Sequence, residues 1–170
     1  MARNVEIKAR IDSIESVLPR ARSLADADAK RIVQDDTFFR VARGRLKLRE
    51  LGDGSAELIH YQRPDSTAAK LSDYVRWPVA EASGLREALV RALGTLGRVR
   101  KQRLLLMVGA TRIHLDRVAG LGDFVELEVV LRDGQSEAEG AAIAERLMCE
   151  LGLAAAPRVA GAYVDLPATA

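Results

Sequence analysis

Charged side chains recur at every second residue in five short stretches of the chain, with mostly aliphatic side chains between them. A period of two is typical of a β-strand, whose successive side chains point to opposite faces of a sheet. In each stretch the charged groups are therefore expected to share one face and the aliphatic groups the other. The stretches are residues 4–10, 45–49, 101–103, 112–116 and 126–129.

The basic positions of this pattern suit a bound polyphosphate. A triphosphate carries about four negative charges, and the arginine fork matches phosphate oxygens in bidentate fashion. So many cations from separate strands are more than a fold is expected to bring together without an anionic ligand. The candidate phosphate-binding residues are Lys8, Arg10, Lys47, Arg49, Arg63, Arg76, Lys101, Arg103 and Arg112.

The acidic positions of the same pattern suit a divalent metal ion. Mg²⁺ and Mn²⁺ take carboxylate oxygens and often share the phosphates of a substrate. Glu126 and Glu128 lie two apart on one predicted strand and so point the same way, and Glu6 from another strand could complete the site. We predict these three as metal ligands. Asp116 is either a further metal ligand or the residue that orients one of the phosphate-binding arginines.

The bulk composition describes a single soluble domain spanning 1–170. The chain has 170 residues, 48% of them hydrophobic and 29% charged, as in ordinary globular proteins. A net charge of +2 from 26 basic and 24 acidic residues is too balanced for a nucleic-acid partner. The single Cys149 excludes an internal disulfide and suits a reducing compartment. With no leader and no apolar run near the ~20 residues that span a bilayer, we expect a cytoplasmic protein without a membrane partner.

Turn and capping residues divide the chain into a mixed α+β order. Helices are predicted from about Asp12 or Ser13 to Leu24, over 81–96 with one buried apolar stripe, and from the capping box of Ser136 and Glu139 to Leu151. About eight strands, mostly joined as hairpins and so mostly antiparallel, are expected at 4–11, 37–41, 45–51, 56–63, 72–79, 99–108, 111–118 and 123–131.

Two arrangements of the charged face are open from the pattern alone. An antiparallel sheet commonly has one solvated face, where alternating charges have no function. Alternatively, the aliphatic face packs against the amphipathic helices while the charged face closes on itself as the lumen of a barrel. The almost purely aliphatic character of the opposite face suits the second arrangement.

The chain resembles the CYTH domain family of triphosphate tunnel metalloenzymes, which includes class IV adenylate cyclases and thiamine triphosphatases. The most specific pieces are the N-terminal Glu-x-Lys and the Gly-Leu-Gly-x-Phe-x-Glu-x-Glu stretch, and all pieces follow the family order over nearly the whole chain. The matching segments are Val5–Lys8, Leu46–Glu50, Val99–Arg103, His114–Val118, Gly120–Glu128 and Ala162–Leu166. The resemblance implies a closed eight-stranded antiparallel tunnel with a charged lumen and helices outside.

The resemblance also implies an enzyme that uses Mg²⁺ or Mn²⁺ on a triphosphate substrate such as ATP, thiamine triphosphate or tripolyphosphate. The Gly-Leu-Gly-Asp-Phe and Lys-Gln-Arg pieces are closer to the cyclase-like branch, so conversion of ATP to cyclic AMP and pyrophosphate is favoured over triphosphate hydrolysis. The chain is expected to act as a monomer or a homodimer. The catalytic residues so implied are Lys8, Lys101, Arg103 and Asp116.

One departure from the family pattern concerns the first glutamate of its Glu-x-Glu-x-Lys signature, which is Asn4 here. The amide removes one negative charge from the metal site. It supports a third interpretation, a protein that binds organic phosphates with little turnover. His114 has no second His or Cys at ligand spacing, so no zinc site is expected, and Cys149 is expected to be buried in the last helix.

Overall fold

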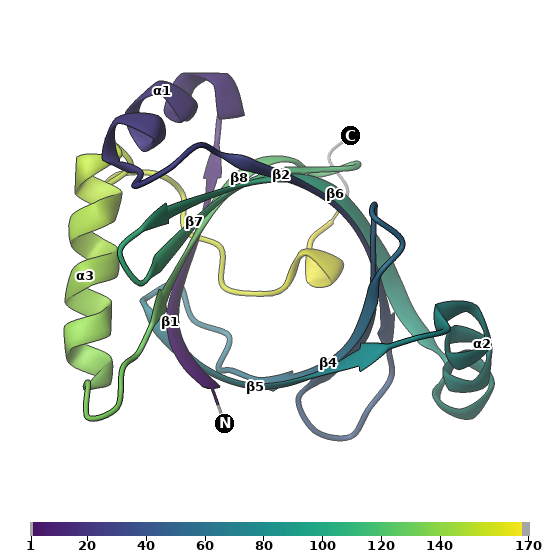
Figure 1. The fold of residues 1–170 in the computed structure, drawn as a ribbon. Coiled ribbons are helices and arrows are strands. Elements are labelled where there is room, and N and C mark those ends of the chain that lie inside the picture. The colour runs from purple at the N-terminus through teal and green to yellow at the C-terminus, as the bar shows by residue number, and fades with distance from the viewer. Residues whose placement is uncertain (1, 168–170) are drawn as a thin grey trace.

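The computed structural model describes residues 2–167, and in that part of the chain eight strands close into an antiparallel barrel (Figure 1). The order around the barrel is β1-β5-β4-β3-β2-β6-β7-β8, and it closes because β1 pairs with both β5 and β8. The predicted α+β fold with a closed eight-stranded antiparallel barrel is confirmed. The strands are β1 Ala2–Ile11, β2 Lys30–Phe39, β3 Arg45–Leu51, β4 Ala56–Gln62, β5 Lys70–Val79, β6 Thr95–Val108, β7 Thr111–Val118 and β8 Gly122–Val130.

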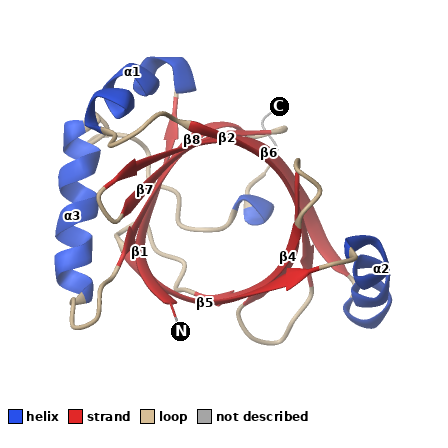
Figure 2. Ribbon diagram, viewed as in Figure 1, coloured by secondary structure: helices blue, strands red, loops and turns tan. Residues whose placement is uncertain are grey.

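Three α-helices lie outside the barrel, as the apolar strand faces predicted (Figure 2). Helices α1 (Ile14–Leu24) and α3 (Glu137–Glu150) cover the outer face of β1, β7 and β8. Between them lies the main core, where side chains such as Ile7, Ile113 and Leu127 are at most 1% exposed. The aliphatic side chains of these strands therefore pack against the helices on the outer face of the barrel. The charged side chains that alternate with them point into the lumen.

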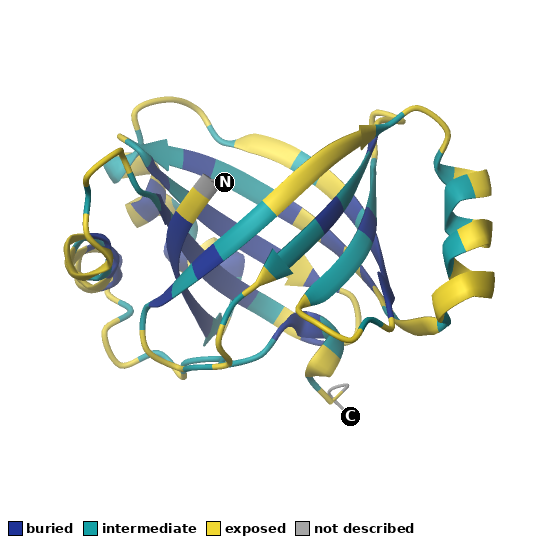
Figure 3. Ribbon diagram, turned by 90° about the horizontal axis from the view of Figure 1, so that it is seen from below, coloured by how far each residue is buried: buried dark blue, intermediate teal, exposed yellow. Residues whose placement is uncertain are grey.

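Helix α2 (Ala82–Leu93) stands apart from this core, and two predictions about it were wrong. The helix ends at Gly94, whose positive φ of 74° suits glycine, so Leu96 belongs to β6 rather than to the helix. None of its residues is buried, as the colours of Figure 3 show, in contrast to the single buried stripe expected. The helix contacts the barrel mainly at β2 and β3, where Arg86 pairs with Glu50, while its Val90 and Leu93 are 40% and 36% exposed.

Two further details differ from expectation. Strand β2 begins at Lys30, well before the predicted start at Thr37. Cys149 is exposed rather than buried, because α3 turns its neighbours Leu147 and Met148 toward the barrel instead. Among the helices of the described residues, none has the length and apolar character needed to cross a membrane.

The C-terminal segment enters one end of the barrel. Backbone hydrogen bonds tie it to β1, from Arg10 N to Pro157 O and from Val159 N to Lys8 O, each 2.9 Å long. The short 3₁₀ helix η1 (Tyr163–Asp165) follows inside the ring of strands (Figure 1). Tyr163 there joins an apolar cluster that closes this end of the barrel, formed by Phe38, Val99, Val118, Leu121, Phe124 and Tyr163.

Candidate functional site

The lumen of the barrel holds a cavity of about 360 Å³, to which all eight strands contribute side chains. This volume lies at the lower end of the range for small-molecule sites, about 300–1,000 Å³. Of the described residues that line it, nine are basic and five acidic. The charged positions with a period of two therefore face a shared interior and not solvent, and the cavity carries an excess of positive charge.

Eight of the nine predicted phosphate-binding residues line this cavity, and the ninth does not. Arg10 instead donates to the carbonyl of Leu121 and lies over the ring of Phe124, with 4.6 Å from its Cζ to the ring centroid. Arg76 is at the edge of the cavity, where its half-exposed side chain pairs with Glu57. The cavity-lining members are Lys8, Lys47, Arg49, Arg63, Arg76, Lys101, Arg103 and Arg112.

Asp116 is the fully buried anchor of two lumen cations. Arg103 donates to its two carboxylate oxygens over 2.6 and 2.7 Å, Lys101 donates over 2.9 Å, and the hydroxyl of Tyr163 donates over 3.0 Å. Burial alone would raise the pKa of Asp116, but Arg103 and Lys101 hold that pKa far below its usual range. Asp116 does not line the cavity, and its hydrogen bonds fix the positions of Lys101 and Arg103.

Asp36 on β2 does the same for a second pair of cations, and sequence reasoning missed it. It accepts from Lys47 Nζ and from Arg49 Nε and Nη2, each over 2.8 Å. The opposing charges keep its pKa low despite burial. Burial, aided by the neighbouring arginines, lowers the pKa of Lys47 to about 7 and that of Lys101 to about 8. Each of two Lys-Arg pairs is thus fixed by one buried aspartate. One pair lies on β3 and the other on β6, the two strands that flank β2.

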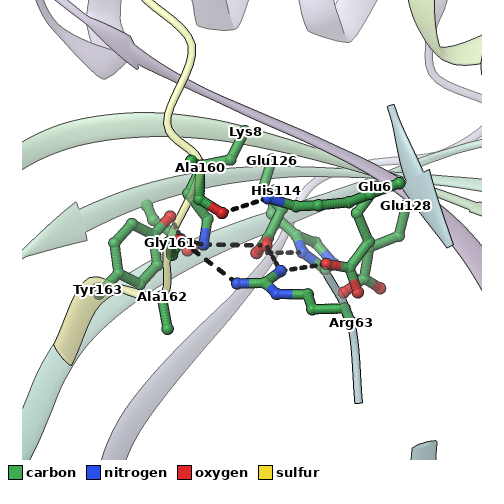
Figure 4. A network of polar contacts seen from close by, with 12 residues as sticks. Glu6, Lys8, Arg63, His114, Glu126, Glu128, Ala160, Gly161, Ala162 and Tyr163 are labelled. Atoms are coloured by element: carbon green, nitrogen blue, oxygen red, sulfur yellow. Dashed lines mark hydrogen bonds and ion pairs between the residues drawn. The ribbon is translucent and has the colours of Figure 1, made fainter. Parts of the chain in front are cut away.

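Three side chains of types that bind metal ions lie close together on β7 and β8. One ligand atom from each of His114, Glu126 and Glu128 lies within 4.8 Å of the others. Register places them there, because His114 pairs with Glu126 across β7 and β8. Glu126 also lies 3.4 Å from Lys8 Nζ (Figure 4). It lies 3.0 Å from Arg103 Nη2.

Glu6, the third predicted metal ligand, lies beside this group but is engaged elsewhere. Its carboxylate forms an ion pair with Arg63, and Figure 4 shows this pair next to Glu128. Burial raises the pKa of Glu6, against the opposing effect of Arg63. The structure therefore brings Glu126 and Glu128 together with His114, where the sequence pattern proposed Glu6.

Backbone carbonyls of the C-terminal segment accept hydrogen bonds from three buried or partly buried basic side chains. Lys8 donates to Gly161 O over 3.5 Å, Arg63 donates to the same oxygen over 3.4 Å, and Lys70 donates to Ala160 O. The ring of Tyr163 lies beneath Lys8, at 4.1 Å from Nζ to the centroid. Lys70 and Tyr163 were missed, because a lysine and a tyrosine outside the alternating stretches carry no pattern.

The donors present fit a divalent cation. Two carboxylates and an imidazole converge, and both Asn4 Oδ1 and His114 Nδ1 are buried without a hydrogen-bond partner. A buried polar atom without a partner costs about 1–3 kcal/mol, and an ion bound to His114 would relieve that cost at its ring. The site therefore combines a lining of basic side chains with three side chains suited to a divalent ion.

The chain is similar to known proteins in its sequence family and in its fold. The family model described as the CYTH domain matches residues 2–163. A comparison with curated protein sequences finds no match.

Several solved structures share the fold across most of their length. The PH1012 protein from Pyrococcus horikoshii is 22% identical with a TM-score of 0.86, and the match covers 96% of this chain and 98% of that one. A proposed adenylate cyclase from Vibrio parahaemolyticus is 19% identical, with a TM-score of 0.74 and 94% of each chain covered. HpAC1 from Hippeastrum, a proposed adenylyl cyclase with a dominant triphosphatase activity, is 15% identical with a TM-score of 0.65, covering 95% and 91%. At these identities the likeness shows the fold alone.

Proposed function

Because the chain belongs to the CYTH domain family, we propose that it is a metal-dependent enzyme that cleaves the triphosphate group of a substrate bound in its tunnel. One observation carries the proposal: nine basic side chains line one cavity of about 360 Å³, beside a pair of carboxylates suited to a divalent ion. Cleavage of a phosphoanhydride needs little covalent help from the protein. It needs positioning and stabilisation of charge on phosphate oxygens.

The cations held by the two buried aspartates form the phosphate clamp. Asp116 and Asp36 keep Arg103 and Arg49 in fixed orientations, so these forks need no reordering when an anion enters. Lys101 and Lys47 add point charges beside them. Lys8 and Arg112 extend the clamp along β1 and β7, where each pairs with a carboxylate of β8.

The carboxylates of β8 hold the metal ion in this proposal, with Glu6 available when Arg63 turns to a phosphate. Mg²⁺ or Mn²⁺ bound there would neutralise charge on the phosphate oxygens and help to orient the attacking group. Glu126 and Glu128 are positioned for this by their register opposite Lys8 and Glu6. The protein side chains then hold the triphosphate in line with whichever nucleophile attacks.

Cyclisation of ATP is the reaction we propose first. In it the ribose 3′-hydroxyl attacks the α-phosphate, a new O–P bond forms, and pyrophosphate leaves. Besides the cyclase-like motifs, an apolar wall supports an organic substrate group: Ile32, Leu51 and Leu105 line the cavity on the adjacent strands β2, β3 and β6. Such a wall has no use for a bare polyphosphate and suits a base or ribose.

Hydrolysis of a triphosphate is the second candidate, with water as the nucleophile at the terminal phosphate. The likeness in fold to HpAC1, with its dominant triphosphatase activity, supports it. The third, phosphate binding with little turnover, is supported by Asn4, which leaves the metal site one charge poorer than the family pattern.

Product analysis separates these reactions. The purified protein is mixed with ATP and with tripolyphosphate, in Mg²⁺ and separately in Mn²⁺. Cyclic AMP with pyrophosphate, lost in Lys101→Ala and Glu126→Ala, supports the cyclase, whereas orthophosphate with a diphosphate supports the hydrolase. Arg98→Ala is the control, since Arg98 pairs with Asp35 outside the cavity lining. Neither product, with triphosphate still bound, would contradict the enzyme and leave the binding protein.

A further inference from the structure

The imidazole of His114 is a buried polar group that the phosphate clamp does not use. The residue is 3% exposed, and Nδ1 has no hydrogen-bond partner. Nδ1 lies 3.8 Å from Glu126 Oε2, and Nε2 lies 3.9 Å from Glu128 Oε2. Both separations exceed the length of a hydrogen bond. A histidine that served only the packing of the barrel would be expected to satisfy its ring nitrogens.

The separations instead suit a shared ion. Ligand atoms at 2.0–2.2 Å from one metal ion lie about 3–4.4 Å from one another, given the usual bond lengths. One atom from each of His114, Glu126 and Glu128 already lies within 4.8 Å of the others. Small rotations of the side chains therefore bring the three atoms to bonding distance, without movement of the strands.

The scaffold holds these residues rigidly. His114 and Glu126 face each other across paired strands in the middle of β7 and β8, and Glu128 is the next lumen position on β8. Sites on paired strands are more precise than sites on loops. The ion pairs of Glu126 with Lys8 and Arg103 leave it free lone pairs, because a carboxylate offers about four acceptor positions.

We infer that His114 is a ligand of the tunnel metal ion, together with Glu126 and Glu128, and that the site therefore prefers first-row transition metal ions to Mg²⁺. The inference rests on the proposed function for the presence of a metal ion in the tunnel. Mg²⁺ takes oxygen ligands almost alone, whereas imidazole nitrogen is a good ligand for transition metals. Asn4, an amide in place of a carboxylate, gives the site no negative charge. His114 gives it a nitrogen ligand instead.

The test measures coordination directly, with Mn²⁺ as the probe and no substrate. The chain has two histidines, and the other, His60, bonds the carbonyl of Arg43 and does not line the cavity. His60→Gln therefore leaves one histidine for ¹⁵N labelling. Electron spin echo spectroscopy of the Mn²⁺ complex of His60→Gln is expected to show coupling to one imidazole nitrogen, and ¹⁵N-histidine is expected to change that signal.

Metal titration gives the second measurement. We expect Mn²⁺ to bind the wild type at least about tenfold more tightly than Mg²⁺. His114→Gln is expected to weaken Mn²⁺ binding at least about tenfold while changing Mg²⁺ binding by less than about threefold, in keeping with the 10–100-fold effects of altered metal surroundings. His60→Gln should change neither affinity.

A Mn²⁺ complex of His60→Gln without nitrogen coupling would overturn the inference, and so would an unchanged ratio of Mn²⁺ to Mg²⁺ affinity in His114→Gln. The nitrogen coupling needs no variant at position 114, so poor folding of His114→Gln does not weaken the test. Failure here leaves the proposed function standing if ATP or tripolyphosphate is still cleaved. Nitrogen coupling without cleavage of either would overturn the proposed function and keep the ligand.

Discussion

Replacement of Asp116 by asparagine tests whether the lumen cations depend on a buried counter-charge. Asp116 is 0% exposed and accepts four hydrogen bonds, from Arg103, Lys101 and Tyr163. Asparagine keeps the shape but removes the charge and turns an amide N–H₂ toward one cation. Breaking a buried ion pair on one side costs about 3–5 kcal/mol, and we expect Asp116→Asn to lose about that much free energy of unfolding.

Asp35→Asn is the matched control. Arg98 also holds Asp35 in bidentate fashion, with both N–O distances 2.7 Å. The side chain of Arg98 is 50% exposed, however, and exposed pairs contribute at most about 1 kcal/mol. The same geometry in two environments should therefore give two clearly different losses.

Urea unfolding with linear extrapolation measures both losses. The reasoning is refuted if Asp116→Asn unfolds within about 1 kcal/mol of the wild type, or if both variants lose equal amounts. A second arm adds tripolyphosphate in EDTA. Since a bound anion would replace the lost charge, it should stabilise Asp116→Asn more than the wild type, and equal stabilisation would show that Lys101 and Arg103 do not meet the phosphate.

Three further predictions concern the clamp, the metal site and the closed end. With a pKa of about 7, Lys47 is charged below pH 7 and loses its charge as the pH rises through 7. The affinity of the metal-free protein for tripolyphosphate should therefore fall between pH 7 and 9, by up to about tenfold per pH unit. Arginine in Lys47→Arg stays charged, so the affinity of this variant should fall less, and parallel curves of affinity against pH for the two proteins would contradict this. Asn4→Glu adds a carboxylate where a buried amide has no hydrogen-bond partner for Oδ1. Calorimetry should find that this variant binds Mg²⁺ about tenfold more tightly than the wild type. An unchanged affinity would count against a role for position 4 in metal binding. Phe124→Ala removes a fully buried ring from the cluster that closes the barrel and should cost about 3–5 kcal/mol of unfolding free energy, while a loss below about 1 kcal/mol would show that the cluster is poorly packed.

Much of the barrel was predictable because a strand buried on one face and charged on the other has a plain period of two. Lys47 with Arg49, and Glu126 with Glu128, carry that period without interruption. Strand β2 was only partly found, because its lumen positions mix isoleucine, glutamine, aspartate and phenylalanine. Asp36 is one of them, and its role depends on partners from the neighbouring strand β3.

The errors share one physical cause, which is that local pattern does not specify the partner. The apolar spacing of Leu85 and Leu89 predicts a helical face but not how deeply it is covered, and no residue of α2 is buried. Spacing along the chain likewise gave no sign that strand register sets His114 opposite Glu126. Contacts made across a sheet are not visible in the spacing along one strand.

Binding of tripolyphosphate to the metal-free protein tests the central claim most directly, because it isolates the cation-lined tunnel from the chemistry. Titration calorimetry in EDTA should show one molecule bound per chain, with affinity lowered at least about tenfold by Lys101→Ala and unchanged by Arg98→Ala. No binding, or equal binding by all three proteins, would contradict the claim that the tunnel is a triphosphate site.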